Sequence, residues 1–158
     1  CVAEIMGVSD HANQIIEERY SSILSQLTTN KKRVSNKNIS AMVIYSMQGT
    51  SPIVSGSGES GDAFIQLTGA KNAFADFEGW KPTSAESIIA NNPDFIIVTN
   101  RLLNRFSSIE ELRKHPSLSQ TKAAQNNQII VKDGMAMMGF GPRTIECALE
   151  VSNIFSNK

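Results

Sequence analysis

A mixture of guanidinium, thioether, amide and aromatic side chains follows the predicted strands of this chain. It consists of Met47, Gln48, Arg101, Arg105, Met135, Met137, Met138 and Phe140. In open α/β sheets, ligands bind at the carboxyl ends of the strands. Thioethers adapt to irregular apolar surfaces, and arginine pairs with carboxylates, so the mixture would suit a large flat apolar ligand with acidic groups. On spacing alone, the sequence favours the alternative that the methionines fill the core and the arginines are solvated.

No constellation typical of an enzyme emerges. His11 and His115 lie in polar helical segments and are interpreted as facing solvent. Gly56, Gly58 and Gly61 match a dinucleotide fingerprint, but the preceding strand ends about ten residues too early for its tight turn. Neither a GxSxG elbow nor a GK[ST] sequence is present. We therefore predict no catalytic residue and no catalytic cofactor, and a small nucleotide-using α/β enzyme remains the alternative from another class.

The cysteines do not predict a metal site. Cys1 and Cys147 are the only two in the sequence, and neither has a paired Cys or His at metal-binding spacing. Cys147 falls on the apolar face of the last predicted helix and is interpreted as a buried, inert thiol.

Composition excludes several classes of protein. The chain has 158 residues, of which 41% are hydrophobic and 19% charged, so it is long enough for a core and unlike a disordered chain. Its 15 basic and 15 acidic residues argue against a nucleic-acid binder. No apolar run reaches the roughly 18 residues of a membrane-spanning helix. The first residues show no signal-peptide pattern, which does not argue against export if the chain is part of a longer protein.

The hydrophobic pattern alternates between helices and strands. Buried strands are predicted at 39–45, 94–99 and 128–132, and helices at 2–7, 10–27, 60–68, from 83 to about 91, from 108 to Pro116, and 142–155. Segments 28–38, 48–61, 101–108, 117–127 and 135–141 are predicted loops. Strands separated by helices imply right-handed crossovers. We expect an α/β fold in three layers, with a parallel or mostly parallel central sheet of three or four strands flanked by helices.

Local signals set several helix ends. Thr83 with Glu86, and Ser108 with Glu111, form predicted capping boxes. Gly69 is a natural left-handed terminator, and Pro142 suits the first position of the last helix.

Three segments in order resemble the haem (haemin) periplasmic binding proteins of bacterial ABC importers. GAKNAFADFEGWKPTSAESIIANNPDFIIVT (69–99) is similar to the Asn-Ala, Lys-Pro-x-Ser-x-Glu and Pro-Asp signature of that family. SPIVSGSGESGDAFIQLTGA (51–70) resembles its glycine-rich loop and following helix. DGMAMMGFGPRTIECAL (133–149) is similar to its Gly-Phe-Gly-Pro-Arg ending, which is not typical of siderophore or cobalamin relatives.

The resemblance implies the helical-backbone class of periplasmic binding protein, with two α/β lobes, one joining helix and a ligand cleft between the lobes. All matched features belong to the carboxyl-terminal lobe. We therefore expect residues 1–27 to be the end of the interlobe helix and the following helix, and 28–158 to be the carboxyl-terminal lobe. The amino-terminal lobe, which usually supplies the tyrosine that ligates haem iron, would be absent from this chain.

By resemblance, haem is the transported ligand. From the resemblance and from the side chains that follow the predicted strands, we expect six residues to contact it: Met47, Gln48, Arg101, Met135, Met138 and Phe140. Arg101 matches a loop position where many relatives carry arginine and is assigned to a propionate. Where some relatives place an iron-binding histidine, this chain reads Ser46-Met47-Gln48-Gly49, so no metal ligand is expected in this lobe.

Glu86 matches the exposed glutamate with which this lobe docks on arginines of the permease, and it is also the third helical residue of the predicted capping box with Thr83. The resemblance implies a non-enzymatic, periplasmic component of an ABC transporter that delivers haem to a permease dimer in the inner membrane. A siderophore- or cobalamin-binding protein of the same class remains the near alternative.

Overall fold

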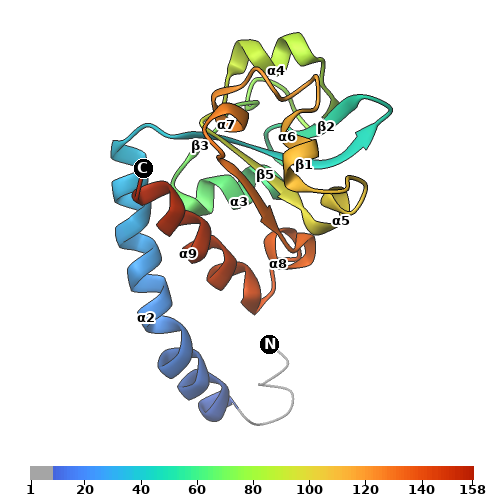
Figure 1. Cartoon of the computed structure of the whole chain (residues 1–158). Helices are drawn as coiled ribbons and strands as arrows, with labels where there is room; N and C mark the ends of the chain where they lie inside the picture. Colours follow the sequence, from blue (N-terminus) through green and yellow to red (C-terminus); the bar gives the residue numbers. More distant parts are fainter. Residues whose placement is uncertain (1–8) are drawn as a thin grey trace.

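The computed structural model describes residues 9–158 of the chain (Figure 1). The strands are β1 (Ser40–Gln48), β2 (Ser51–Ser55), β3 (Lys71–Asn72), β4 (Trp80–Pro82), β5 (Phe95–Thr99) and β6 (Ile129–Lys132). The helices are α2 (Ser9–Asn36), α3 (Ser60–Thr68), α4 (Ala85–Asn91), α5 (Asn100–Leu103), α6 (Ile109–Arg113), α7 (Lys122–Gln125), α8 (Gly134–Met138) and α9 (Pro142–Ser156). The predicted helix at 2–7, with its end at Gly7, lies outside the described residues.

Over the described residues 9–158, six strands, more than the three or four predicted, form one mixed sheet in the order β4-β2-β1-β5-β6, with β3 also paired to β1. Strands β1, β5 and β6 are parallel, as the crossover pattern predicted, and β3 is parallel to β1. The prediction of a long loop at 48–61 was wrong, because β2 folds back on β1 as an antiparallel hairpin and pairs in turn with β4. The predicted three-layer α/β class with a mostly parallel core is confirmed.

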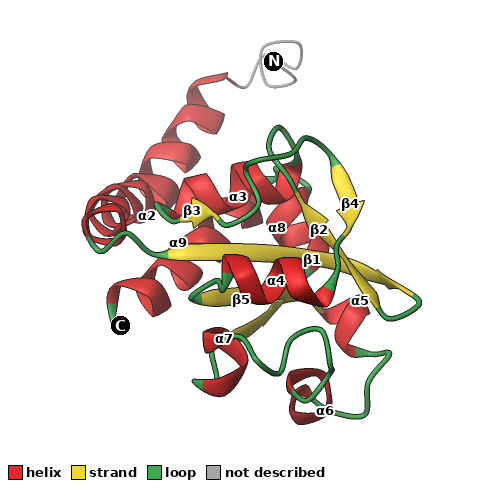
Figure 2. Ribbon diagram, turned by 90° about the horizontal axis from the view of Figure 1, so that it is seen from above, coloured by secondary structure: helices red, strands yellow, loops and turns green. Residues whose placement is uncertain are grey.

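Two hydrophobic cores cover the two faces of the sheet. One joins β1 to α2, α3, α8 and α9. It includes a tilted contact between the rings of Phe95 and Phe155, whose centroids lie 4.5 Å apart. The other joins β1 and β5 to α4, α5, α6 and α7, through Ile88, Leu102 and Leu112. Figure 2 shows α2 and α3 on one side of the sheet and α6 and α7 on the other. We call these the α9 face and the α4 face.

Helix α2 is longer than predicted and reaches Asn36. The segment 28–36 was predicted as an exposed loop because it is polar and basic. Within it, Asn30 and Val34 are buried, and the amide of Asn30 donates to Ser152 and Asn153 of α9 at 3.2 and 2.6 Å. Packing against α9 therefore continues the helix, and the expected boundary between 27 and 28 falls inside it.

The predicted caps differ in one place. Helix α4 is capped by Ser84, whose hydroxyl accepts from the backbone N–H of Ser87, and not by Thr83. Ser108 caps α6 as predicted, Gly69 ends α3 with φ +91°, and Pro142 opens α9. Three segments predicted as irregular contain the short helices α5, α7 and α8, capped by Thr99, Thr121 and Asp133. Over residues 9–158, no helix is long and apolar enough to cross a membrane.

Candidate functional site

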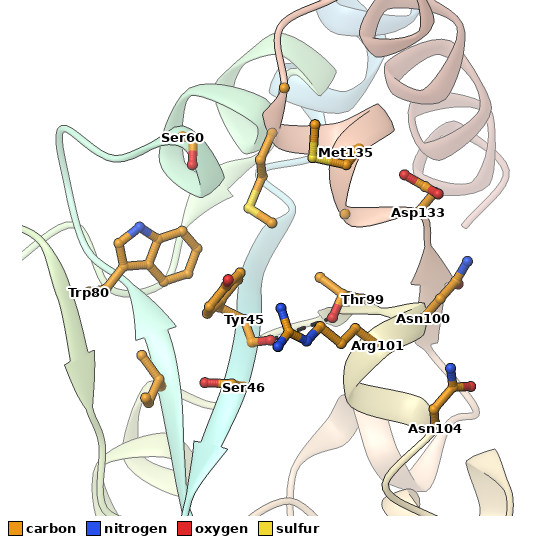
Figure 3. A pocket seen from close by; sticks show the side chains of 14 residues that line it. Tyr45, Ser46, Ser60, Trp80, Thr99, Asn100, Arg101, Asn104, Asp133 and Met135 are labelled. Carbon is orange, nitrogen blue, oxygen red and sulfur yellow. Dashed lines mark hydrogen bonds between the residues drawn. The ribbon is translucent and has the colours of Figure 1, made fainter.

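A cavity of about 930 Å³ lies on the α9 face, at the carboxyl ends of β1, β5 and β6 (Figure 3). Its walls come from β1, β2, β4, β5, α3, α5 and α8. The lining side chains of aromatic, thioether, amide, hydroxyl and charged type are Tyr45, Ser46, Ser60, Trp80, Thr99, Asn100, Arg101, Asn104, Asp133, Met135 and Met138, with Ile53, Gly134 and Gly139. This is the sheet edge at which open α/β proteins bind ligands.

A β-bulge places Tyr45 at the centre of the cavity wall. Ile44 pairs with Val54 and Ser46 with Ile53, so Tyr45 is an extra residue on β1. The residues from Ala41 to Ile44 are fully buried, whereas Tyr45 is 45% exposed. Tyr45 and Ser46, the two residues of the bulge, both line the cavity. Bulges beside a binding site commonly change the direction of side chains in this way.

Trp80 on β4 forms the neighbouring aromatic wall. The centroid of its ring lies 5.6 Å from that of the Tyr45 ring, and the two ring planes are tilted by 52°. It also lies against the first turn of α3, because a Cβ added to Gly61 would come within 2.9 Å of the tryptophan ring. The two aromatic side chains therefore form one surface, and α3 packs against its Trp80 side.

The glycine-rich segment 56–61 surrounds a buried carboxylate and does not form a phosphate loop. Asp62 is 5% exposed and accepts hydrogen bonds from the backbone N–H of Gly58, the amide of Gln66 and the amide of Asn72, at 3.2, 2.8 and 3.0 Å. A carboxylate at this position would repel a phosphate. A Cβ on Gly56 would lie 2.3 Å from the carbonyl oxygen of Phe77, so this glycine serves close backbone packing.

Helix α8 supplies the thioether wall. Asp133 caps it by accepting from the backbone N–H of Ala136 at 2.8 Å, which turns the chain directly after β6. Met135 is 71% exposed, while Met138 packs partly on the core of the α9 face. The thioethers thus face the aromatic wall across the cavity.

Arg101 supplies the positive charge. It lies in α5, which starts directly after β5 because the hydroxyl of Thr99 accepts from the backbone N–H of Leu102 at 3.1 Å. Arg101 is exposed, and Figure 3 shows its side chain extending from α5 toward β1. Asn100 and Asn104 of the same segment add amide groups to this side.

The structure brings three of the six predicted contact residues together, since Arg101, Met135 and Met138 line the cavity. Gln48 is exposed at the far end of β1, and Phe140 follows α8 with 55% exposure, and neither lines the cavity. Met47 is 8% exposed and lies in the core of the α4 face. The bulge explains this position, because an extra residue at Tyr45 reverses the alternation and turns Met47 to the face of Met42 and Ile44.

Sequence reasoning missed Tyr45 and Trp80. Tyr45 ends the apolar run 39–45 and was read only as a strand residue, although the last residue of such a strand faces the binding edge. Trp80, the single tryptophan of the chain, lies inside one of the motif segments.

The described residues offer no cluster of three or more His, Cys, Asp or Glu side chains that could hold a free metal ion. His115 is half-buried against Phe106, its Nδ1 accepts from the backbone N–H of Ser117, and burial lowers its pKa. Cys147 is 6% exposed, and burial raises its pKa to about 11, so this thiol is inert as predicted.

Glu86 lies outside the cavity, in the first turn of α4. Its side chain is fully exposed. Hydrogen bonds from its own backbone N–H and from Ser84 lower its pKa, so the carboxylate is charged at neutral pH.

The match to a known family spans most of the chain. A family model described as "Periplasmic binding protein" covers residues 2–135. The chain belongs to this family. The periplasmic binding protein family consists of binding components and not of enzymes, and the resemblance predicted from the motifs is confirmed at this level.

Similar proteins of known structure include periplasmic binding proteins for haem. The haem-binding protein HutB of Vibrio cholerae is 27% identical with a TM-score of 0.81, and the match covers 97% of this chain and 59% of HutB. The haem-binding protein RhuT of Roseiflexus sp. RS-1 is 25% identical with a TM-score of 0.78, covering 99% of this chain and 59% of RhuT. Among curated proteins, the chain is 23% identical to one described as "Uncharacterized ABC transporter substrate-binding lipoprotein YvrC" of Bacillus subtilis (strain 168), over 96% of this chain and 46% of YvrC. The chain thus spans about half to three fifths of the length of these relatives.

Proposed function

We propose that this chain is the carboxyl-terminal lobe of a haem-binding protein of an ABC importer. In this proposal the protein works outside the cytoplasmic membrane, captures haem between two lobes and delivers it to a membrane permease dimer without covalent chemistry. The cavity on the α9 face would hold one side of the haem, and a second lobe would cover the other.

The observation that carries the proposal is the composition of the cavity. Tyr45, Trp80 and the thioethers of Met135 and Met138 offer a wide apolar surface for a flat macrocycle. Arg101 offers a guanidinium to a propionate. The identities of 25% and 27% with two haem-binding proteins support this cargo over others.

Absorbance and fluorescence titrations with ferric haem test the proposal. Because the chain has a single tryptophan and that residue lines the cavity, its fluorescence reports binding at this site. We expect a saturable shift of the Soret band together with quenching of Trp80. The affinity should be weak, because one lobe covers only one side of the ligand.

Three other ligands give the comparison. A ferric hydroxamate siderophore and cobalamin represent the near alternatives, and ATP represents a nucleotide-using enzyme. We expect none of them to protect the chain from thermal unfolding as haem does. Saturable binding of one of them, with no response to haem, would replace the proposed cargo.

Permease docking by Glu86 belongs to the same proposal. An exposed, charged carboxylate at a helix start suits an arginine pocket on a partner. Its separation from the cavity lining means that docking and ligand binding can be tested apart.

A further inference from the structure

Tyr45 interrupts the buried central strand of the sheet. Without the bulge, regular alternation would place residues 43, 45 and 47 on one face. The bulge keeps Tyr45 on the α9 face with Val43 but sends Met47 to the opposite core. The result is a half-exposed phenol directly after the fully buried residues 41–44, in the wall of the cavity.

We propose that Tyr45 supplies an axial oxygen ligand to the iron of bound ferric haem, an inference that rests on the proposed function. Tyrosine is an established haem ligand, and its phenolate is a hard anionic donor suited to ferric iron. The proposal departs from the expectation from the motifs, which left this lobe without an iron ligand because residues 46–49 lack a histidine.

The other donors of the cavity are less suited to ferric iron. None of the described lining residues is a histidine or cysteine. The carboxylate of Asp133 accepts from the backbone N–H of Ala136 and so holds the start of α8. Met135 and Met138 offer soft thioethers, which favour softer metal states than ferric iron. The phenol of Tyr45 remains the hard oxygen donor of this wall.

One neighbour packs on the ring of Tyr45, and another anchors its backbone. On the β4 side, the centroid of the Trp80 ring lies 5.6 Å from that of Tyr45. Trp80 in turn packs against Gly61 of α3. On the β5 side, the hydroxyl of Thr99 donates to the backbone carbonyl of Tyr45 at 3.4 Å. A side chain that packs on one neighbour and whose backbone is anchored loses less conformational freedom when it binds iron than an unrestrained one.

The test compares ferric haem complexes of this chain and two variants. The chain has only two tyrosines, Tyr45 and Tyr20 on α2, so a tyrosinate signal can come only from these. Tyr45→Phe keeps the ring but removes the oxygen, and Tyr20→Phe is the matched control. We expect iron–tyrosinate bands in resonance Raman spectra of the wild type and Tyr20→Phe, their loss in Tyr45→Phe, and an affinity for ferric haem about tenfold lower in Tyr45→Phe.

The outcomes separate the ligand from the function. If the wild type binds haem without tyrosinate bands, or Tyr45→Phe keeps them, the assignment of Tyr45 is overturned while the proposed function stands. If the spectrum of the ferric haem complex changes in Met135→Leu but not in Tyr45→Phe, the iron ligand is the thioether of Met135 and not the phenol of Tyr45. If the wild type does not bind haem at all, the proposed function fails, and the ligand assignment fails with it. Circular dichroism of Tyr45→Phe shows whether this variant is folded. Even if it is not, the absence of tyrosinate bands from the wild-type haem complex overturns the assignment.

Discussion

Arg101 is the only cation among the cavity-lining residues that the structure describes. If it pairs with a propionate, Arg101→Ala should weaken ferric haem binding by about 1.5–3 kcal/mol, the value of a hydrogen bond to a charged group. The loss should shrink as salt is added, because screening weakens the pair in the wild type. Soret titrations at low and high salt measure both effects.

Arg113 on α6 provides the matched control, because it is an arginine at the end of another short helix and lies outside the cavity. Arg113→Ala should leave haem affinity unchanged. Equal affinities for the Arg101→Ala variant and the wild type would refute the propionate contact and leave Arg101 as a solvated residue.

Phe140 has a strained backbone. Its φ is +48°, in the left-handed region that costs an L-residue roughly 1–2 kcal/mol. Phe140→Ala and Phe140→Gly both remove the ring, but only glycine relieves the strain. We therefore expect the glycine variant to be more stable than the alanine variant by about 1 kcal/mol in urea unfolding. An alanine variant as stable as the glycine variant would show that the backbone relaxes at this position.

The capping of α4 can be tested at the scale of the element. Ser84 accepts from the backbone N–H of Ser87 at 3.2 Å, so Ser84→Ala should lower the free energy of unfolding by about 1 kcal/mol. Ser84→Asp should recover most of this loss, because aspartate caps equally well and its charge favours the helix start. Thermal unfolding of the three proteins measures the difference. No loss in Ser84→Ala would mean that solvent replaces the cap.

Elements with a strong local signal could be predicted from the sequence, and those made by tertiary contacts could not. The buried runs that became β1, β5 and β6 and the cap of α6 are local patterns. In contrast, β2 lies in a glycine-rich stretch and exists because it pairs with β1 and β4. The last turns of α2 exist because Asn30 and Val34 pack against the rest of the fold.

The same limit explains the site. The loops after β5 and β6 were predicted to carry ligand contacts, and Arg101, Met135 and Met138 do line the cavity. A bulge depends on pairing with a neighbouring strand, so the sequence could not show that Tyr45 faces the cavity and Met47 the core. That the cavity-lining residues contact haem stays a prediction.

At the scale of the whole molecule, Asp94 ties together the start of β5, the start of β1 and the last residue. Its carboxylate accepts from the backbone N–H of Ser40 at 3.0 Å and from the ammonium of Lys158 at 2.8 Å. Partial burial alone would raise the pKa of Asp94, but the hydrogen bonds from Lys158 and Ser40 outweigh it and lower the pKa below the ordinary 3.8.

Stability should therefore depend on the charge of Asp94 in acid. Because the folded pKa is below the unfolded one, the contribution is present above pH 3.8 and is lost as pH falls toward the folded pKa. The pair is partly exposed, so we expect less than about 1 kcal/mol. Asp94→Asn should remove this part of the acid dependence in urea unfolding at several pH values. A variant with the wild-type acid dependence would place the dependence on other carboxylates.

Assembly with a permease gives the last prediction, because Glu86 lies outside the haem cavity. Glu86→Gln should leave the Soret titration unchanged but strongly reduce haem uptake by cells that depend on this importer, since the neutral amide gives up charge-assisted pairing with arginine. Glu110 is the matched control: it is also fully exposed, in the first turn of a serine-capped helix, with its pKa lowered by its own backbone N–H and by Ser108. Glu110→Gln should preserve uptake. Equal loss in both variants would indicate a general effect of surface charge, and weaker haem binding by Glu86→Gln would place this residue in ligand binding and not in docking.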